Sequence, residues 1–376
     1  MVKYDIKCLR CGTKLPSKKW FWKHEEDNGT LTIAYKDVES YRFKDVLNTE
    51  FIDIRRYANL LPIRLKTLNM APISPTPIVK RRIRGVNAFF KLEYLLPSGS
   101  FKDRGALISI AKVKELRIKS IIEDSSGNAG IAFTLFSSIY GMQANIFIPK
   151  DAPEGKKRML KALGANVYEV EGSREKVNYE AREYERKGYG VYVGHWWNPF
   201  FIEGIKTIAF ELHEQIGISN VDAIIVPTSS GGLLLGIYKG VVELKKMGEI
   251  PKLPRLIAVQ ASGYARLCYE LGYGMGVEYS KLADGLRINN PPRIGEMVLA
   301  VKETKGTCYY VTDDEIKKSL KKLWSMGFTV EPTSAVTFSA LLKALSERVI
   351  EKESNVVIVL TGSGLKMLDK ILSLIT

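Results

Sequence analysis

The chain has 376 residues, of which 45% are hydrophobic and 26% charged, and its formal net charge is +15. A chain of this length and composition can form two or three domains with hydrophobic cores, and general disorder is excluded. No apolar run reaches the roughly 18 residues of a membrane span and no signal-peptide core follows Met1, so we expect a cytoplasmic protein without a membrane partner. The basic residues are spread along the chain in short runs, which argues against nucleic acid as the partner.

The N-terminal segment contains half of a possible metal site. Cys8 and Cys11 form a Cys-x-x-Cys pair of the kind found in zinc knuckles, but a structural zinc site needs four ligands. No second cysteine pair follows, and His24 and the three acids after it are the nearby candidates. We therefore expect a small β-rich segment without metal. The other cysteines, Cys268 and Cys308, are isolated in the sequence, and a disulfide scaffold is excluded at this chain length.

From about residue 85 the sequence alternates between strand and helix patterns. Short β-branched runs bounded by turn residues predict strands at 120–124, 144–149, 165–170, 222–227, 255–260 and 355–360. Longer periodic segments predict helices at 103–116, 129–141, 203–217 and 232–248. This alternation predicts parallel sheets with helices on both faces. The number of units exceeds one sheet, so we expect an α/β protein with two doubly wound lobes and a cleft between them.

Four polar, glycine-rich loops follow predicted strands, at residues 98–105, 125–130, 228–232 and 361–366. Ligands of open α/β sheets bind at the carboxyl ends of the strands, so we expect these loops to form one site. The third loop precedes a predicted helix and its small residues leave backbone N–H groups accessible, which suits a phosphate. The first loop carries Lys102 after Ser-Gly-Ser. A phosphate loop combined with a sheltered lysine favours pyridoxal phosphate, whose aldehyde binds a lysine amine.

Six motifs occur in a fixed order along the chain: PSGSFKDRGA, SSGNAG, NPFFIEGIKTIAFEL, PTSSGGLLLG, EPTSAV and LTGSGLK. With these motifs, residues 65–376 resemble the threonine synthase branch of the tryptophan synthase β-like family, which are pyridoxal-phosphate enzymes of fold type II. The resemblance implies a large cofactor-binding lobe over residues 61–97 and 204–376 and a small mobile lobe over 98–203. Residues 1–60 would then be an N-terminal extension that resembles a degenerate zinc ribbon. It also implies a homodimer that acts on a small amino acid.

The resemblance assigns roles to individual residues. Lys102 stands at the position of the family's Schiff-base lysine. Asn128 corresponds to the residue that hydrogen-bonds the cofactor's 3′-hydroxyl, and Thr361 to a neutral hydroxyl facing the pyridine nitrogen. A hydroxyl does not keep that nitrogen protonated, which suits elimination and replacement more than transamination. The cofactor phosphate would be bound by Ser229, Ser230, Gly231, Gly232 and Leu233, and the substrate carboxylate by Ser125, Ser126, Gly127 and Ala129.

The sequence departs from this family where threonine synthases bind the phosphate of the substrate. Relatives have a serine and then Asn-Pro-x-Arg, whereas here Trp196 replaces the serine and Phe201 the arginine, although Asn198 is kept for substrate binding. A buried dianion needs paired charge, so another cation must compensate. Arg287 is the first candidate and His195 the second, although a histidine in this aromatic cluster can also be a packing residue.

The resemblance implies an amino-acid biosynthetic lyase that converts O-phospho-L-homoserine and water to L-threonine and phosphate. Lys102 would carry protons between substrate carbons, which requires a lowered amine pKa. An alternative keeps the cofactor but predicts β-elimination or β-replacement on serine, threonine or O-phosphoserine, as in an ammonia-lyase or a phosphoserine-dependent synthase. A third alternative is a non-catalytic amino-acid or nucleic-acid binder.

Overall fold

The computed structural model describes residues 2–70 and 73–375. The chain forms two compact units, each built from two segments. Unit 1 comprises Met1–Ser74 and Lys102–Ile205, and unit 2 comprises Pro75–Phe101 and Lys206–Thr376. The chain therefore passes from one unit to the other directly before Lys102 and directly after Ile205. The domain bounds given by the sequence resemblance stay predictions.

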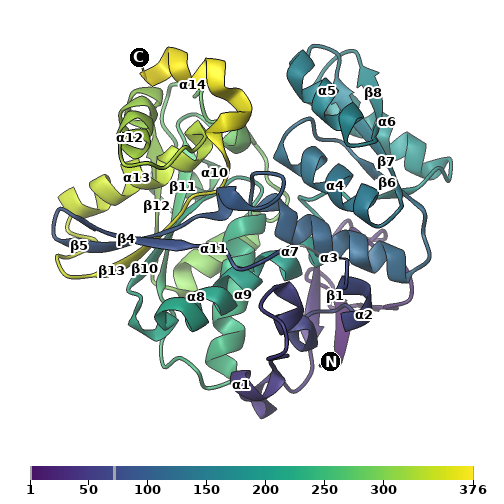
Figure 1. Ribbon diagram of the computed structural model, residues 1–376, viewed down its shortest axis with the longest axis horizontal. Coiled ribbons are helices and arrows are strands. Elements are labelled where there is room, and N and C mark those ends of the chain that lie inside the picture. Colours follow the sequence, from purple (N-terminus) through teal and green to yellow (C-terminus); the bar gives the residue numbers. More distant parts are fainter. Residues whose placement is uncertain (1, 71–72, 376) are drawn as a thin grey trace. The chain divides into compact units, whose positions relative to one another are not determined.

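Unit 1 contains a parallel sheet of four strands in the order β8-β7-β6-β9. Its strands are β6 (Ser120–Glu123), β7 (Gln143–Pro149), β8 (Asn166–Val170) and β9 (Val191–Tyr192). Its helices are α3 (Lys102–Glu115), α4 (Asn128–Ile139), α5 (Glu154–Ala162), α6 (Arg174–Arg186) and α7 (Pro199–Ile205). In Figure 1, α4, α5 and α6 lie beside this sheet. Residues 144–148 of β7 are all buried, as expected for a parallel strand covered on both faces.

The N-terminal segment of unit 1 is a small antiparallel sheet, as its β-rich sequence predicts. Its strands are β1 (Tyr4–Cys8), β2 (Lys14–Leu15) and β3 (Leu31–Tyr35), in the order β2-β1-β3. Ile6 and Leu31 are fully buried under it. Short helical turns follow at α1 (Phe43–Val46), η2 (Ile54–Leu60) and α2 (Leu65–Leu68).

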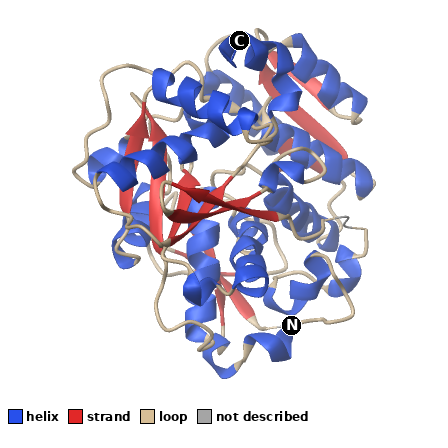
Figure 2. Cartoon of the chain, turned by 60° about the vertical axis from the view of Figure 1, so that its left-hand side comes forward, coloured by secondary structure: helices blue, strands red, loops and turns tan. Residues whose placement is uncertain are grey.

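Unit 2 contains a sheet of six strands in the order β12-β11-β10-β13-β5-β4, in which only the edge pair β4–β5 is antiparallel. Its strands are β4 (Ile78–Ile83), β5 (Val86–Lys91), β10 (Ala223–Pro227), β11 (Arg255–Ala261), β12 (Thr307–Val311) and β13 (Asn355–Val359). All five residues of β10 are buried. Figure 2 shows the strands in red flanked by helices in blue. The predicted α/β class with parallel sheets is confirmed.

The helices of unit 2 follow its strands in sequence. They are α8 (Thr207–Ile216), α9 (Gly232–Lys246), α10 (Arg266–Glu270), α11 (Ile294–Glu303), α12 (Asp313–Ser325), α13 (Pro332–Ser346) and α14 (Leu368–Ile375). Two signals fix the start of α12, because Thr312 accepts from the backbone N–H of Glu315 while the Glu315 carboxylate accepts from that of Thr312. The single helix predicted over residues 203–217 is two helices, because α7 ends at Ile205 and α8 begins at Thr207.

The cysteines that looked isolated in the sequence are joined. Cys268 in α10 and Cys308 in β12 form a disulfide, with their Cα atoms 5.1 Å apart. The expectation of isolated thiols is therefore wrong. The physical reason is that 40 residues separate the two cysteines, and only the fold brings α10 beside β12.

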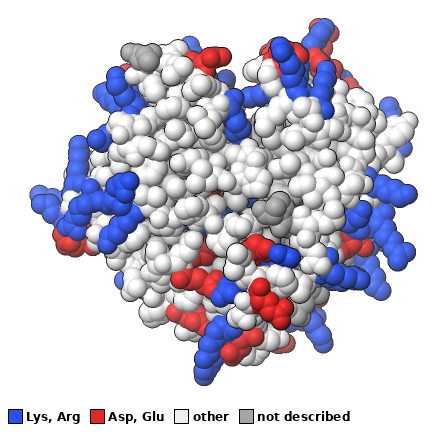
Figure 3. Space-filling view, viewed as in Figure 1, with Lys and Arg blue, Asp and Glu red and all other residues white. Residues whose placement is uncertain are grey.

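The surface carries its basic residues in several separate groups. Figure 3 shows Lys and Arg side chains at several places on one face, with Asp and Glu side chains among them. Within residues 2–70 and 73–375, no helix has both the length and the apolar composition needed to cross a membrane.

Candidate active site

The backbone directly before Lys102 is fixed to the loop that follows β13. The N–H of Phe101 donates to the carbonyl of Thr361 at 3.0 Å, and the N–H of Ser363 donates to the carbonyl of Gly99 at 2.9 Å. Gly99 adopts φ +75°, a conformation that favours glycine. Two of the four predicted loops, 98–105 and 361–366, are thus hydrogen-bonded to each other within unit 2.

The hydroxyl of Thr361 is oriented by Ser334, at the start of α13. The Ser334 oxygen accepts from the backbone N–H groups of Thr361 and Gly362, both at 2.9 Å. These two bonds use both of its lone pairs, so Ser334 cannot accept from Thr361, and its one proton goes to the Thr361 oxygen at 2.9 Å or to the Gly362 carbonyl at 3.3 Å. The Thr361 proton is then directed elsewhere, which suits a bond to an unprotonated ring nitrogen. The sequence analysis quoted the motif EPTSAV but assigned no role to its serine.

The loop before α9 fits a phosphate. Gly231 adopts φ +96°, and α9 begins at the next residue, so the N–H groups of its first turn lack helical acceptors. The Ser229 hydroxyl oxygen is buried and has no hydrogen-bond partner among the described residues. A buried hydroxyl without a partner costs free energy unless a ligand binds it. Ser230 and Leu233 are buried beside it.

The loop of residues 125–130 joins β6 to α4 in unit 1. Like the loop before α9, it contains glycine and leads directly into a helix. Gly127 is the N-cap of α4, and its N–H donates to the Ser125 hydroxyl at 3.2 Å. A Cβ on Gly130 would lie 1.8 Å from the Ser125 carbonyl oxygen, so only glycine allows this tight turn. Asn128 and Ala129 form the first turn of α4, where backbone N–H groups suit a carboxylate. Ser126 is half-buried in the same turn.

Lys102 begins α3 and faces an aromatic ring. Its Nζ lies 5.5 Å from the ring centroid of Phe201, which is fully buried on α7. Gly105 makes room for this ring, because a Cβ there would lie 2.4 Å from it. The position where the resemblance implies an arginine therefore presents an apolar face to the lysine amine and supplies no charge.

His195 and Glu123 form a buried pair beside the Phe201 ring. The ring centroids of His195 and Phe201 are 5.9 Å apart, and His195 Nδ1 lies 2.8 Å from Glu123 Oε1. Burial raises the pKa of Glu123 well above its usual value, and the neighbouring Asp124 adds to this. Burial also holds the pKa of His195 well below 6.5, with Lys102 adding to the effect. These shifts favour the neutral forms of both groups, in which the Glu123 carboxyl can donate its proton to His195 Nδ1.

Asp124 anchors the start of the loop 125–130. Its carboxylate accepts from the Tyr192 hydroxyl at 3.0 Å and from the Asn178 amide at 2.8 Å, and it pairs with Arg174 at 2.9 Å. Arg174 in turn lies 5.5 Å from the Trp196 ring. The sequence analysis gave no role to Glu123 or Asp124. Their position at the end of a buried apolar strand is the sequence signal by which both acids could have been identified.

The remaining predicted substrate residues have different surroundings. Asn198 is buried, and its amide donates to Ser109 and to the Val193 carbonyl while its oxygen accepts from Phe200. Only one lone pair of that oxygen is left for a substrate. Arg287 follows the turn η5 (Asp284–Leu286) in unit 2, with its side chain 46% exposed and its Nη1 3.9 Å from Asp284.

Comparison with known proteins identifies the family. Residues 70–362 match the model of the family described as pyridoxal-phosphate dependent enzyme. The chain is 30% identical over 380 residues to the threonine synthase of Methanosarcina acetivorans, which covers 96% of this chain and 92% of that protein. It is 31% identical over 319 residues to human serine racemase, covering 81% of this chain and 89% of that protein.

Among solved structures, maize serine racemase matches with a TM-score of 0.68 and 25% identity, over 82% of this chain and 95% of that one. The cofactor of this family is pyridoxal phosphate, and the similarity to threonine synthases supports elimination or replacement chemistry on an amino acid. The family model covers most of the chain, and the loop before α9 fits the cofactor's phosphate. This chain therefore belongs to the pyridoxal-phosphate dependent enzyme family and is a lyase.

Proposed function

We propose that the chain is a threonine synthase that converts O-phospho-L-homoserine and water to L-threonine and phosphate. The observation that carries this proposal is the extent of the similarity. The match to the Methanosarcina threonine synthase covers 96% of the chain, so it includes most of the N-terminal segment, whereas the match to human serine racemase covers 81%.

In this proposal each loop has one task. When bound, pyridoxal phosphate supplies an electron sink for chemistry at the substrate's α-carbon. The Lys102 amine takes the aldehyde and afterwards carries protons at its Nζ. The loop 229–233 binds the cofactor phosphate, Asn128 the 3′-hydroxyl and the Thr361 hydroxyl the ring nitrogen. The loop 125–129 binds the substrate carboxylate at the N-terminus of α4.

The phosphate of the substrate needs a cation in place of the arginine that Phe201 replaces. Phe201 is apolar, and the neutral His195 cannot offset a dianion. We assign this role to Arg287, whose guanidinium can bind two phosphate oxygens at once. Asn198 then positions residues 193–200 and contributes at most one acceptor.

A second candidate function is β-elimination on unphosphorylated serine or threonine. The specific observation that favours it is the apolar face of Phe201, 5.5 Å from the Lys102 amine. A pocket lined in this way accepts a short hydroxyl side chain more readily than a phosphate.

The cofactor assignment is tested by borohydride reduction of the purified protein. Reduction should bleach the yellow colour and leave a pyridoxyl label on Lys102, located by mass spectrometry of peptides. Lys114→Ala is the matched control, because Lys114 lies on the same helix and is exposed, and this variant should keep its colour while Lys102→Ala loses it. A label on another lysine would contradict the assignment of Lys102.

The substrate is tested with O-phosphohomoserine, O-phosphoserine, serine and threonine in parallel. Threonine synthase predicts equal amounts of phosphate and threonine from O-phosphohomoserine. Ammonia from serine or threonine, with no turnover of either phosphorylated compound, would replace the proposal with the second candidate.

A further inference from the structure

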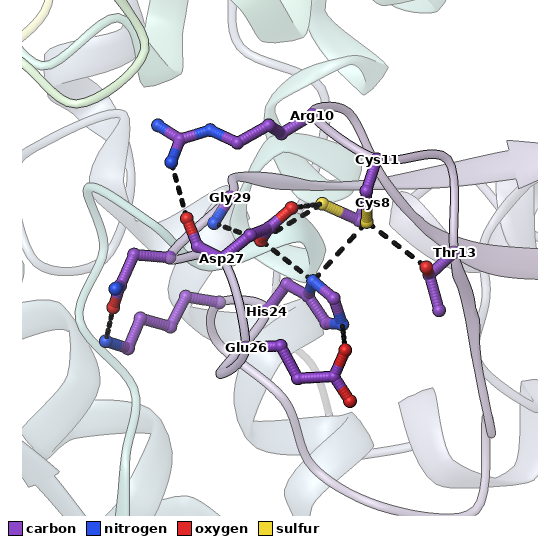
Figure 4. Close-up of polar contacts among 10 residues, drawn as sticks. Cys8, Arg10, Cys11, Thr13, His24, Glu26, Asp27 and Gly29 are labelled. Atoms are coloured by element: carbon purple, nitrogen blue, oxygen red, sulfur yellow. Dashed lines mark hydrogen bonds and ion pairs between the residues drawn. The ribbon is translucent and has the colours of Figure 1, made fainter.

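Four side chains near the N-terminus meet at one point. Cys8 and Cys11 come from the end of β1 and the turn after it, and His24 and Asp27 come from the segment before β3. One potential ligand atom from each lies within 4.8 Å of all the others. Figure 4 shows the two sulfur atoms, the imidazole and the carboxylate pointing toward one another.

The separations match those of tetrahedral metal ligands. Cys8 Sγ lies 3.4 Å from Asp27 Oδ2, and Cys11 Sγ lies 3.5 Å from His24 Nδ1. With Zn–S bonds of about 2.3 Å and Zn–N or Zn–O bonds of about 2.1 Å, tetrahedral geometry separates ligand atoms by about 3.4–3.8 Å. His24 Nδ1 and Asp27 Oδ1 are hydrogen-bonded at 2.8 Å and would have to open by about 0.6 Å to fit this geometry, while any pair near the upper limit of 4.8 Å would have to close by about 1 Å.

The backbone around the cluster is fixed independently of any ion. The N–H of Gly12 donates to the Cys8 carbonyl at 3.0 Å, and Gly12 adopts φ +79° to close that turn. The N–H of Gly29 donates to Asp27 Oδ1 at 2.7 Å, and the N–H of His24 donates to the Gly29 carbonyl at 2.9 Å. A Cβ on Gly29 would lie 2.5 Å from the Cys8 sulfur, so glycine keeps this position open for the cluster.

We propose that Cys8, Cys11, His24 and Asp27 bind one zinc ion in a closed structural site. Two sulfurs, one imidazole nitrogen and one carboxylate oxygen are all zinc ligands, and four protein ligands leave no open coordination position. His24 binds through Nδ1, and its Nε2 lies 3.9 Å from the exposed Glu26 carboxylate, beyond hydrogen-bond distance. The sequence argument expected no metal because it required a second cysteine pair; His24 and Asp27 take its place.

The ion would fix a loop that packs on the rest of unit 1. Between Cys11 and His24 the chain carries Trp20, whose ring stacks on Phe200 at 5.6 Å and whose indole N–H donates to the Tyr192 carbonyl at 2.9 Å. Trp22 contacts the Tyr192 ring edge-on at 5.0 Å. Tyr192 also bonds Asp124, so zinc at the N-terminus would help to hold the segment that leads to Phe201.

Metal content of the full-length protein tests the proposal. The protein is expressed with added zinc, purified without chelators or a histidine tag, and measured by elemental analysis. We expect one zinc per chain. Loss of even an outer partner of a metal site costs about 10–100-fold in affinity, so Cys11→Ser and Asp27→Ala should each retain less than about a tenth of the zinc. Glu25→Ala, an exposed acid in the same loop, is the matched control and should retain all of it.

Thiol reactivity gives a second readout that does not depend on folding of a variant. Cys268 and Cys308 are joined, so Cys8 and Cys11 are the free thiols, and Cys11 is exposed. With zinc bound, neither should react with a disulfide reagent until a chelator is added, after which both should react. Fast reaction of Cys11 without chelator, or a protein without zinc, would overturn the proposal. So would a Cys8–Cys11 disulfide, which would leave no thiol to react either before or after chelation.

Discussion

The neutral state of the Glu123–His195 pair can be tested by comparing the pH dependence of stability in the parent and in Glu123→Gln. Glutamine keeps a donor to His195 Nδ1 but cannot ionise. In the folded parent Glu123 keeps its proton well above its usual pKa of 4.5, whereas in the unfolded chain it is ionised above that pH. The folded state therefore binds one more proton at this residue. Stability from a raised pKa is present at low pH and is lost as pH rises.

The expected magnitude follows from this one-proton difference. Each pH unit above 4.5 lowers the free energy of unfolding of the parent, relative to Glu123→Gln, by about 1.4 kcal/mol until Glu123 ionises in the folded state. The stability of the variant relative to the parent should therefore rise steadily from pH 5.5 upward until Glu123 ionises in the folded parent. The His195 contribution, which is lost as pH falls below 6.5, occurs in both proteins and cancels in the difference.

Urea unfolding followed by tryptophan fluorescence measures this difference in unit 1, which holds Trp20, Trp22, Trp196 and Trp197, while Trp324 is in unit 2. Glu171→Gln, at an exposed carboxylate, is the control and should show no such trend. If the difference between parent and Glu123→Gln is constant from pH 5.5 to 7.5, Glu123 is ionised in the folded state and the neutral-pair reasoning is refuted.

Three further predictions concern unit 2. Replacing Cys268 and Cys308 together by alanine should lower its free energy of unfolding by about 4 kcal/mol, from the loop entropy of the 40-residue separation. A reductant should then lower the midpoint of urea unfolding of the parent but leave that of the double variant unchanged. Ser334→Ala leaves two buried N–H groups without an acceptor and should cost about 2 kcal/mol or more in the same assay, and a loss below about 0.5 kcal/mol would contradict the assigned bonds. Arg287→Lys should lower kcat/KM for O-phosphohomoserine by at least about 10-fold, or about 1.4 kcal/mol, without changing cofactor absorbance. Arg266→Lys, with a similar exposure of 43% beside a tyrosine, should leave the rate unchanged, and a silent Arg287→Lys would mean that other groups bind the phosphate.

Local sequence was enough to predict six of the parallel strands and the helices α3, α4 and α9. The runs at 120–124, 222–227 and 355–360 each end within one residue of β6, β10 and β13, because short β-branched segments between turn residues leave few alternatives. The helix break at Lys206 was missed because the apolar pattern continues through it. Lys206 is itself buried and paired with Glu243 at 2.8 Å, a contact that no local pattern reveals.

Residues of the candidate site could be predicted where a single loop contains the groups that would bind a ligand. They could not be predicted where segments far apart in the sequence come together. The residues of the loop before α9 are enough by themselves to predict that this loop binds a phosphate. The role of Ser334 depends on the loop after β13, and the pairing of His195 with Glu123 joins residues 72 positions apart. The approach of His24 and Asp27 to the two cysteines could not be predicted, although both were named as nearby candidates, because it depends on how the segment before β3 folds back onto the end of β1.

The pairing of β5 with β13 sets an order of events during protein synthesis. Asn87 on β5 lies opposite Asn355 on β13, so the sheet of unit 2 cannot close until residues 355–359 have left the ribosome. At about 5–20 residues per second, the β4–β5 hairpin waits about 15–50 s with one edge unpaired, while residues 102–205 of unit 1 are already complete. An unpaired strand edge is a site of aggregation, and the charged run 80–84 on and just after β4 protects this hairpin in the interval. The hydroxyl of Thr361 reaches its place only after β13 has paired, so a nascent chain cannot assemble the Thr361–Ser334 contact until residue 361 has emerged.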